Sequence, residues 1–124
     1  MAEGDAVVYV VDDDEGVRNA LKFALEIEGL DVRLCEGSKA LLAEQSLPLR
    51  ACLVIDYRMP EMDGLELVHA LRARNVTLPV IMITGRANRD LYRRIEKLGV
   101  RCLLEKPLSD SRLVACVRSA LAAG

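Results

Sequence analysis

The sequence has few aromatic residues and no tryptophan, since only 3% of its 124 residues are aromatic. A surface that stacks nucleic-acid bases on aromatic rings is therefore not expected. The formal net charge of -2 is too small to indicate binding to nucleic acid or to a membrane surface. No stretch approaches the ~20 apolar residues of a membrane-spanning helix, and the N-terminus lacks the basic and apolar segments of a secretory signal. These absences favour a cytoplasmic protein that contacts neither a membrane nor nucleic acid directly.

The four cysteines are not spaced like the ligands of a metal site. No two of them lie two or three residues apart, so a thiolate zinc site is not indicated; they are Cys35, Cys52, Cys102 and Cys116. We expect reduced, buried thiols that act as small apolar side chains.

The length and the apolar content of the sequence suit one domain spanning residues 1–124. Hydrophobic residues make up 52% of the chain, enough for a single core built from Leu, Val, Ile and Ala. Short apolar runs rich in β-branched residues predict buried strands at 6–11, 51–55, 79–83 and 100–104, with a weaker edge strand at 31–34. Segments with helical periodicity lie between them, the first carrying Val17, Leu21 and Leu25 and ending at Gly29, the others at about 38–45, 65–73, 88–98 and from 110 onward. This alternation predicts an α/β fold with a parallel sheet and helices on both faces.

Polar residues follow four of the predicted strands, where each strand ends. They are Asp12–Asp14, Asp56, Thr84 and Lys106. Because sites in such sheets form at the carboxyl ends of the strands, we expect these side chains to lie close together. Gathered carboxylates repel each other unless a cation joins them, and oxygen ligands with free positions suit Mg²⁺. An aspartate beside that metal can be a nucleophile toward phosphorus, with an amine and a hydroxyl neutralising the phosphoryl oxygens.

Each of these residues also has a structural explanation. Asp12–Asp14 could cap the first helix, and Asp56 could belong to a turn. Thr84 could cap the fourth helix, and Lys106 could be a solvated side chain. Their joint placement on one edge favours a functional site.

Four separated segments then resemble the signatures of response-regulator receiver domains: Val11–Asp14, Asp56–Gly64, Ile83–Gly85 and Glu105–Pro107. The Arg-Met-Pro-x-Met-x-Gly and Ile-Thr-Gly forms are most similar to the FixJ-type subgroup. The resemblance covers essentially the whole chain. It implies a flavodoxin-like (βα)5 fold with a five-stranded parallel sheet of order 2-1-3-4-5.

The resemblance also implies a role for each site residue. Asp56 is expected to be the phosphoacceptor, with Thr84 and Lys106 binding the phosphoryl group. Expected Mg²⁺ ligands are Asp13, Asp56 and the backbone carbonyl of Arg58, with Asp12 acting mainly through water. Asp14 is expected to cap a helix, and a cis peptide is expected before Pro107.

A partner sensor histidine kinase would supply the phosphoryl group from a phosphohistidine. The chain would not be an enzyme, although it would assist its own phosphorylation and dephosphorylation. Phosphorylation would change the helix 4/strand 5/helix 5 face and so control an output, which the FixJ-type motifs indicate is transcription. The same face is a candidate homodimer surface. The family usually has an aromatic residue where this sequence has Leu103, so we expect a switching route that involves Leu103 instead.

The fourth-helix region is rich in basic residues, which form either a solvated face or a protein contact surface. His69 is expected to be a surface residue.

Three other functions compete with this interpretation. A haloacid-dehalogenase-type enzyme needs a second catalytic Asp two residues after the nucleophile, where this sequence has Arg58. A flavodoxin-like FMN binder needs a phosphate loop rich in hydroxyls and glycine after the first strand, where Asp12–Asp14 stand instead. An interaction module that is never phosphorylated would not need the acidic pair, Asp56, Thr84 and Lys106 together.

Overall fold

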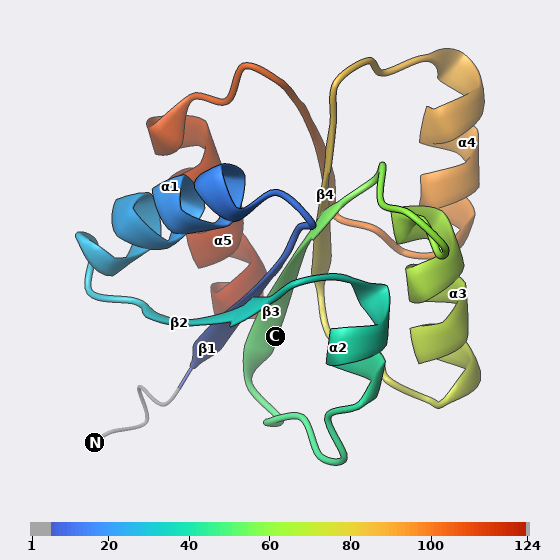
Figure 1. Cartoon of the computed structure of the whole chain (residues 1–124), viewed down its shortest axis with the longest axis horizontal. Helices are drawn as coiled ribbons and strands as arrows, with labels where there is room; N and C mark the ends of the chain where they lie inside the picture. Colours follow the sequence, from blue (N-terminus) through green and yellow to red (C-terminus); the bar gives the residue numbers. More distant parts are fainter. Residues whose placement is uncertain (1–5, 124) are drawn as a thin grey trace.

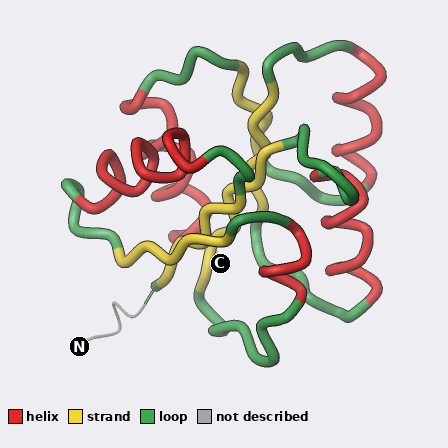
Figure 2. The backbone as a smooth tube through the Cα atoms, viewed as in Figure 1, coloured by secondary structure: helices red, strands yellow, loops and turns green. Residues whose placement is uncertain are grey.

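Strands and helices alternate five times along the chain. The computed structural model describes residues 6–123, so residues 1–5 and 124 of the expected 1–124 domain lie outside the described residues. The elements, drawn in Figure 2, are β1 (Val7–Val11), α1 (Glu15–Glu26), β2 (Asp31–Cys35), α2 (Ser38–Leu42), β3 (Ala51–Asp56), α3 (Gly64–Ala73), β4 (Val80–Thr84), α4 (Arg89–Lys97), β5 (Cys102–Glu105) and α5 (Asp110–Ala123).

The strands form one parallel sheet of order β2-β1-β3-β4-β5, which confirms the expected fold. Figure 1 shows α1 and α5 on one face of the sheet and α2, α3 and α4 on the other. Alternate residues of each central strand therefore enter two separate core layers. On β1, Val8 and Val10 pack with α1 and α5, whereas Tyr9 and Val11 pack with the other three helices. Burial of both faces explains why these strands are continuous apolar runs.

The two edges of the sheet differ from its centre. On β2, Asp31 and Arg33 are exposed, as the expected edge position requires, and β5 has only four residues. The expected start of β5 at Val100 is two residues early, because the Val100 amide donates to the Ile95 carbonyl and completes the turn after α4 instead.

Two helices are shorter than their patterns suggested. Helix α2 ends at Leu42 rather than near residue 45, because residues 43–46 are exposed and have no packing surface to extend along. Helix α4 begins at Arg89, since the Asn88 side chain accepts from the Leu91 amide at 2.8 Å and acts as the N-cap. No helix among the described residues is long and apolar enough to cross a membrane.

The cysteines follow the expectation in part. All four are free; Cys35 and Cys52 are buried, but Cys102 and Cys116 are only half-buried. Cys102 remains partly exposed because β5 lies at the edge of the sheet. His69 is exposed on α3, as expected.

Candidate functional site

The end of β1 places Asp12 inside the protein and Asp13 on its surface. Asp12 is 1% exposed, and its Oδ1 atom accepts from the Asp14 amide at 2.9 Å. The Asp14 side chain in turn accepts from the Val17 amide at 3.0 Å, which confirms Asp14 as the N-cap of α1. Arg18 donates to the Asp12 carbonyl at 2.7 Å. These bonds hold the chain as it turns from β1 into α1 and fix the direction of the Asp12 carboxylate.

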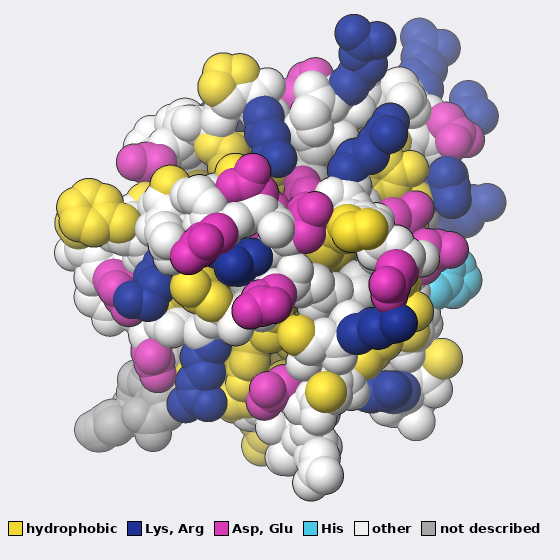
Figure 3. Space-filling view, viewed as in Figure 1, with side chains coloured by type: hydrophobic (Ala, Val, Ile, Leu, Met, Phe, Trp, Pro, Cys, Tyr) yellow, Lys and Arg dark blue, Asp and Glu magenta, His cyan; other side chains and the backbone are white. Residues whose placement is uncertain are grey.

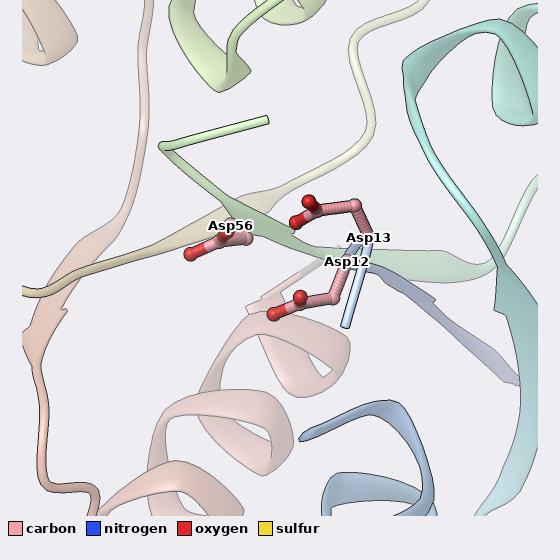
Figure 4. A group of neighbouring side chains, drawn as sticks. All are labelled: Asp12, Asp13 and Asp56. Atoms are coloured by element: carbon pink, nitrogen blue, oxygen red, sulfur yellow. The ribbon is translucent and has the colours of Figure 1, made fainter. Parts of the chain in front are cut away.

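Asp56, at the end of β3, completes an acidic cluster with Asp12 and Asp13. One carboxylate oxygen from each residue lies within 4.8 Å of the other two. Figure 4 shows the three side chains extending in a common direction from the ends of β1 and β3. Asp56 is 5% exposed, whereas Asp13 is exposed, so the cluster has a buried base and an open side.

Lys106 brings a positive charge to this cluster. Its backbone amide donates to the Thr84 carbonyl at 2.9 Å, and its Nζ atom lies 3.4 Å from Asp56 Oδ1. The peptide between Lys106 and Pro107 is cis, as expected. Thr84 is 2% exposed and ends β4 beside β3; its hydroxyl lies 3.2 Å from the Arg86 amide and carbonyl. The edge of the sheet therefore collects acids, an amine and a hydroxyl.

Burial raises the pKa of both inner carboxyl groups. For Asp56 the pKa rises to about 6, mainly because the group is desolvated and secondly because the Asp12 carboxylate is close, while Lys106 opposes the shift. The pKa of Asp12 is also raised, chiefly by burial. Because it is unfavourable for both acids to be ionised together, a nearby cation would stabilise their charged forms.

The raised pKa of Asp56 predicts an unusual dependence of stability on pH. A carboxyl group with a higher pKa in the folded state binds its proton more tightly there, so its contribution is full below the unfolded value of 3.8. This contribution to the free energy of unfolding is lost as the pH rises to about 6, and the total loss is on the order of 3 kcal/mol. We therefore expect Asp56→Asn to gain stability relative to the natural chain across this range in EDTA, as measured by urea unfolding. A difference that stays constant with pH would contradict the shift, and Mg²⁺ should reduce the difference.

The buried base of the cluster fits a divalent cation. Asp12 Oδ2 is buried and has no hydrogen-bond partner among the described residues. A buried carboxylate oxygen without a hydrogen-bond partner destabilises the folded state. A cation, or a water bound to a cation, would supply the missing partner. The donors are all oxygens, which suits a hard ion such as Mg²⁺.

The loop after β3 is held tightly against the sheet. The Tyr57 amide donates to the Ile83 carbonyl at 2.8 Å, and the Gly64 amide donates to the Tyr57 carbonyl at 2.8 Å. On the α2 side, the Ser38 hydroxyl donates to the Met62 carbonyl at 2.9 Å. The exposed Arg58 lies in this loop with its guanidinium 6.0 Å from the centre of the Tyr57 ring.

Gly64 allows this loop to approach the end of β3. A Cβ atom at this position would lie 2.7 Å from the Asp56 carbonyl oxygen and 3.0 Å from Tyr57 Cα, both backbone atoms. We expect Gly64→Ala to destabilise the protein by about 1–3 kcal/mol in urea unfolding, because the backbone that carries Asp56 has to move. Gly85→Ala is the matched control, since a Cβ there meets nothing within 4 Å. Equal stability of the two variants would show that the close approach is unimportant.

Sequence reasoning identified the charged residues of the site but not their supports. Arg18 and Ser38 were missed, because a single Arg or Ser in a helix carries no pattern that indicates a backbone contact elsewhere. In the sequence, Gly64 stands out only as the last residue of the Arg-Met-Pro-x-Met-x-Gly motif. The use of the Arg58 carbonyl as a ligand has no separate structural indication.

Comparisons with known proteins show to which family the chain is similar. The chain is 43% identical over 115 residues to the transcriptional regulatory protein FixJ of Azorhizobium caulinodans, covering 92% of the chain and 54% of that protein. It is 39% identical to the C4-dicarboxylate transport transcriptional regulatory protein DctR of Rhodobacter capsulatus, covering 94% of the chain and 60% of that protein. The chain thus spans little more than half the length of these curated relatives.

Solved structures give the same result. The crystal structure of FixJ-N superposes with a TM-score of 0.88 at 33% identity, covering 98% of this chain and 96% of that one. Full-length FixJ from B. japonicum has a TM-score of 0.86 at 36% identity, covering 95% of this chain and 58% of that one. The family model described as the response regulator receiver domain matches residues 8–118. The chain therefore belongs to the response regulator receiver domain family.

Proposed function

We propose that this chain accepts a phosphoryl group on Asp56, from the phosphohistidine of a partner sensor histidine kinase in the cytoplasm. One observation carries the proposal: the Asp56 carboxylate lies between an acidic pair and the Lys106 amine, which is 3.4 Å away. A nucleophilic carboxylate attacking phosphorus needs the positive charge of a metal on one side and a cation for the phosphoryl oxygens on the other. Residues 1–124 would act as one domain in this role.

Each site residue has a separate task in this proposal. Asp13, Asp56 and the Arg58 carbonyl would bind Mg²⁺ directly, and Asp12 would bind it through water. The bound metal would neutralise the acidic cluster and the oxygens of the incoming phosphoryl group. Lys106 would exchange its contact with Asp56 for one with a phosphoryl oxygen, and the Thr84 hydroxyl would turn from the Arg86 backbone to donate to another. The chain would thus assist its own phosphorylation and dephosphorylation without turning over a separate substrate.

The rival functions fit these residues less well. Arg58 is exposed at the position where a haloacid-dehalogenase-type enzyme needs a catalytic acid, so turnover of phosphate esters lacks its general acid. The loop after β1 offers carboxylates to an FMN phosphate, which would repel it.

The proposal is tested by treating the protein with acetyl phosphate in Mg²⁺ or in EDTA. We expect one phosphoryl group by intact mass in Mg²⁺ only, released by hydroxylamine, as an acyl phosphate is. A protein that stays unmodified in Mg²⁺, or an adduct that resists hydroxylamine, would rule the proposal out.

The output surface would be the face made by α4, β5 and α5. Lys and Arg side chains gather over α4 in Figure 3, and the exposed basic residues of this region are Arg86, Arg89, Arg93, Arg94, Lys97 and Arg101. Leu103 is half-buried and packs in the core layer beneath α3 and α4, so it can transmit a shift of the β4–α4 loop. A second copy of the chain or a linked transcription-controlling domain would contact this face.

Phosphorylation should therefore change the amide exchange of this face. We expect faster or slower deuterium uptake in residues 86–105 after treatment with acetyl phosphate, measured against the untreated protein by mass spectrometry. The segment 21–26 of α1, which lies beyond the Arg18 contact with the Asp12 carbonyl, is the internal control. Unchanged uptake in residues 86–105 of fully phosphorylated protein would exclude this switching route.

A further inference from the structure

A groove runs between α3 and α4, next to the proposed output face. Figure 1 shows these two helices next to each other on the same face of the sheet. The groove has a volume of about 350 Å³ and is lined by Leu65, Glu66, His69, Arg94, Lys97 and Leu98. Neither the acidic cluster nor the proposed phosphoryl transfer uses any of these side chains.

The floor of the groove is apolar. Leu65 is 3% exposed and belongs to the core layer beneath α3 and α4, and the half-buried Leu98 packs against the same layer. The lining residues span positions 65–69 of α3 and reach from position 94 to the end of α4 at position 98, which is about 6 Å along each helix. The groove is therefore long enough for one or two side chains of a partner. An apolar side chain bound there would be removed from water, which favours its binding.

Basic side chains border this floor on the α4 side. Arg94 and Lys97 are exposed, and Lys97 has no ion pair among the residues that the structure describes. Arg94 lies 3.8 Å from Asp90, but both side chains are more than half exposed, so this pair is weak and leaves the guanidinium available. The acid of the lining, Glu66, is held to its own helix, because its carboxylate accepts from the Asp63 amide at 2.9 Å.

The charge of this region differs from that of the rest of the chain. Residues 86–101 contain six basic and two acidic residues, whereas the whole chain has a net charge of -2. Lys and Arg side chains are gathered over α4 in Figure 3. An acidic partner is therefore favoured. Nucleic acid is also acidic, but its phosphates would leave the apolar floor uncovered, and none of the lining residues is an aromatic on which a base could stack.

We propose that the groove between α3 and α4 binds an acidic segment of another protein, whose large apolar side chain lies on Leu65 and Leu98. Carboxylates that flank this apolar side chain would pair with Arg94 and Lys97 at the rim. The apolar contact supplies affinity, and the charged rim selects against basic partners. This contact goes beyond the proposed phosphoryl transfer and does not depend on it, because Asp56 does not line the groove.

The test is a titration of isotope-labelled protein with the synthetic peptide Glu-Asp-Glu-Leu-Phe-Glu-Asp-Glu. His69 is the single histidine of the chain and lines the groove, so the NMR signals of its imidazole report directly on occupancy. We expect these signals to shift and to saturate as peptide is added. A peptide with Ala-Ala in place of Leu-Phe, and one with Gln and Asn in place of its acids, should each bind more weakly by about tenfold or more.

Two charge reversals on α4 locate the contact on the protein. In about 0.15 M salt, which screens distant charges, Lys97→Glu should weaken binding of the acidic peptide by about fivefold or more. Arg93→Glu is the matched control, since it reverses the same charge at an exposed position of the same helix outside the groove, and we expect a change of less than about twofold. Both variants should keep the natural Tm within a few degrees, which excludes a folding defect.

Further measurements separate this proposal from the others. Asp56→Asn should bind the peptide as the natural protein does, so that failure of either proposal leaves the other standing. Unmoved His69 signals at millimolar peptide, equal binding of the Ala-Ala peptide, or equal losses in Lys97→Glu and Arg93→Glu would overturn the proposal. A short DNA duplex that shifts the His69 signals at a lower concentration than the peptide would also overturn it and assign the groove to nucleic acid.

Discussion

Asp56→Asn should abolish the hydroxylamine-labile phosphoryl adduct while leaving the protein folded. The asparagine side chain has nearly the same shape, but its amide oxygen is too weak a nucleophile to form the acyl phosphate. Loss of the carboxylate also removes a charge that is unfavourable at this place, because burial and secondly the nearby Asp12 carboxylate raise the pKa of Asp56. We therefore expect complete loss of the adduct in Mg²⁺ by intact mass, together with a free energy of unfolding in EDTA at neutral pH that is higher by about 1–3 kcal/mol.

Asp14→Asn is the matched control for this variant. Asp14 directly follows the acidic pair, but its side chain caps α1, and asparagine caps helices equally well. The backbone amide that binds Asp12 is unchanged by the substitution. We expect Asp14→Asn to be fully phosphorylated and Asp56→Asn not to be phosphorylated. An adduct that persists in Asp56→Asn would place the phosphoryl group on another residue.

Asp13→Asn should remove about half or more of the stabilisation that Mg²⁺ gives to the natural chain. A ligand that binds only the folded state stabilises it by RT ln(1 + [L]/Kd), about 2.7 kcal/mol at one hundred times Kd. Asp13 is exposed and supports no described side-chain hydrogen bond, so its replacement should change stability in EDTA by less than about 0.5 kcal/mol. In Mg²⁺, we expect binding to be weaker by about tenfold or more, seen as a smaller rise in Tm across a magnesium titration.

The same magnesium titration separates a direct ligand from general charge effects. Asp14→Asn loses the same charge one residue further along and should keep the natural response to Mg²⁺. Ca²⁺ and a monovalent salt at matched ionic strength distinguish specific binding from screening. If Asp13→Asn and the natural protein respond equally to Mg²⁺, Asp13 does not bind the ion.

The edge of the sheet on which the site forms was predictable from the sequence. Parallel strands end on one side, so the residues that follow β1, β3, β4 and β5 had to meet, and this follows from periodicity alone. The 3.4 Å contact of Lys106 with Asp56 and the partnerless Asp12 Oδ2 were not predictable, because they depend on side-chain conformations set by neighbouring loops.

Other features were outside the reach of the sequence for a different reason. Helix α2 is shorter than its pattern because packing, and not propensity, decides where a marginal helix ends. Gly64 is the first residue of α3, an ordinary position in the sequence, and only the path of the backbone reveals how near it comes to Asp56.

The two edge strands also govern how copies of the chain can associate at high concentration. An open strand edge is a template for pairing with another molecule, and charged side chains or a very short strand discourage this. Asp31 and Arg33 on β2 supply the charges, and β5 is the short strand. We therefore expect concentrated protein to resist growth into continuous intermolecular sheets. Its self-association would instead depend on contacts between helix surfaces, which can form and dissolve without disturbing the backbone.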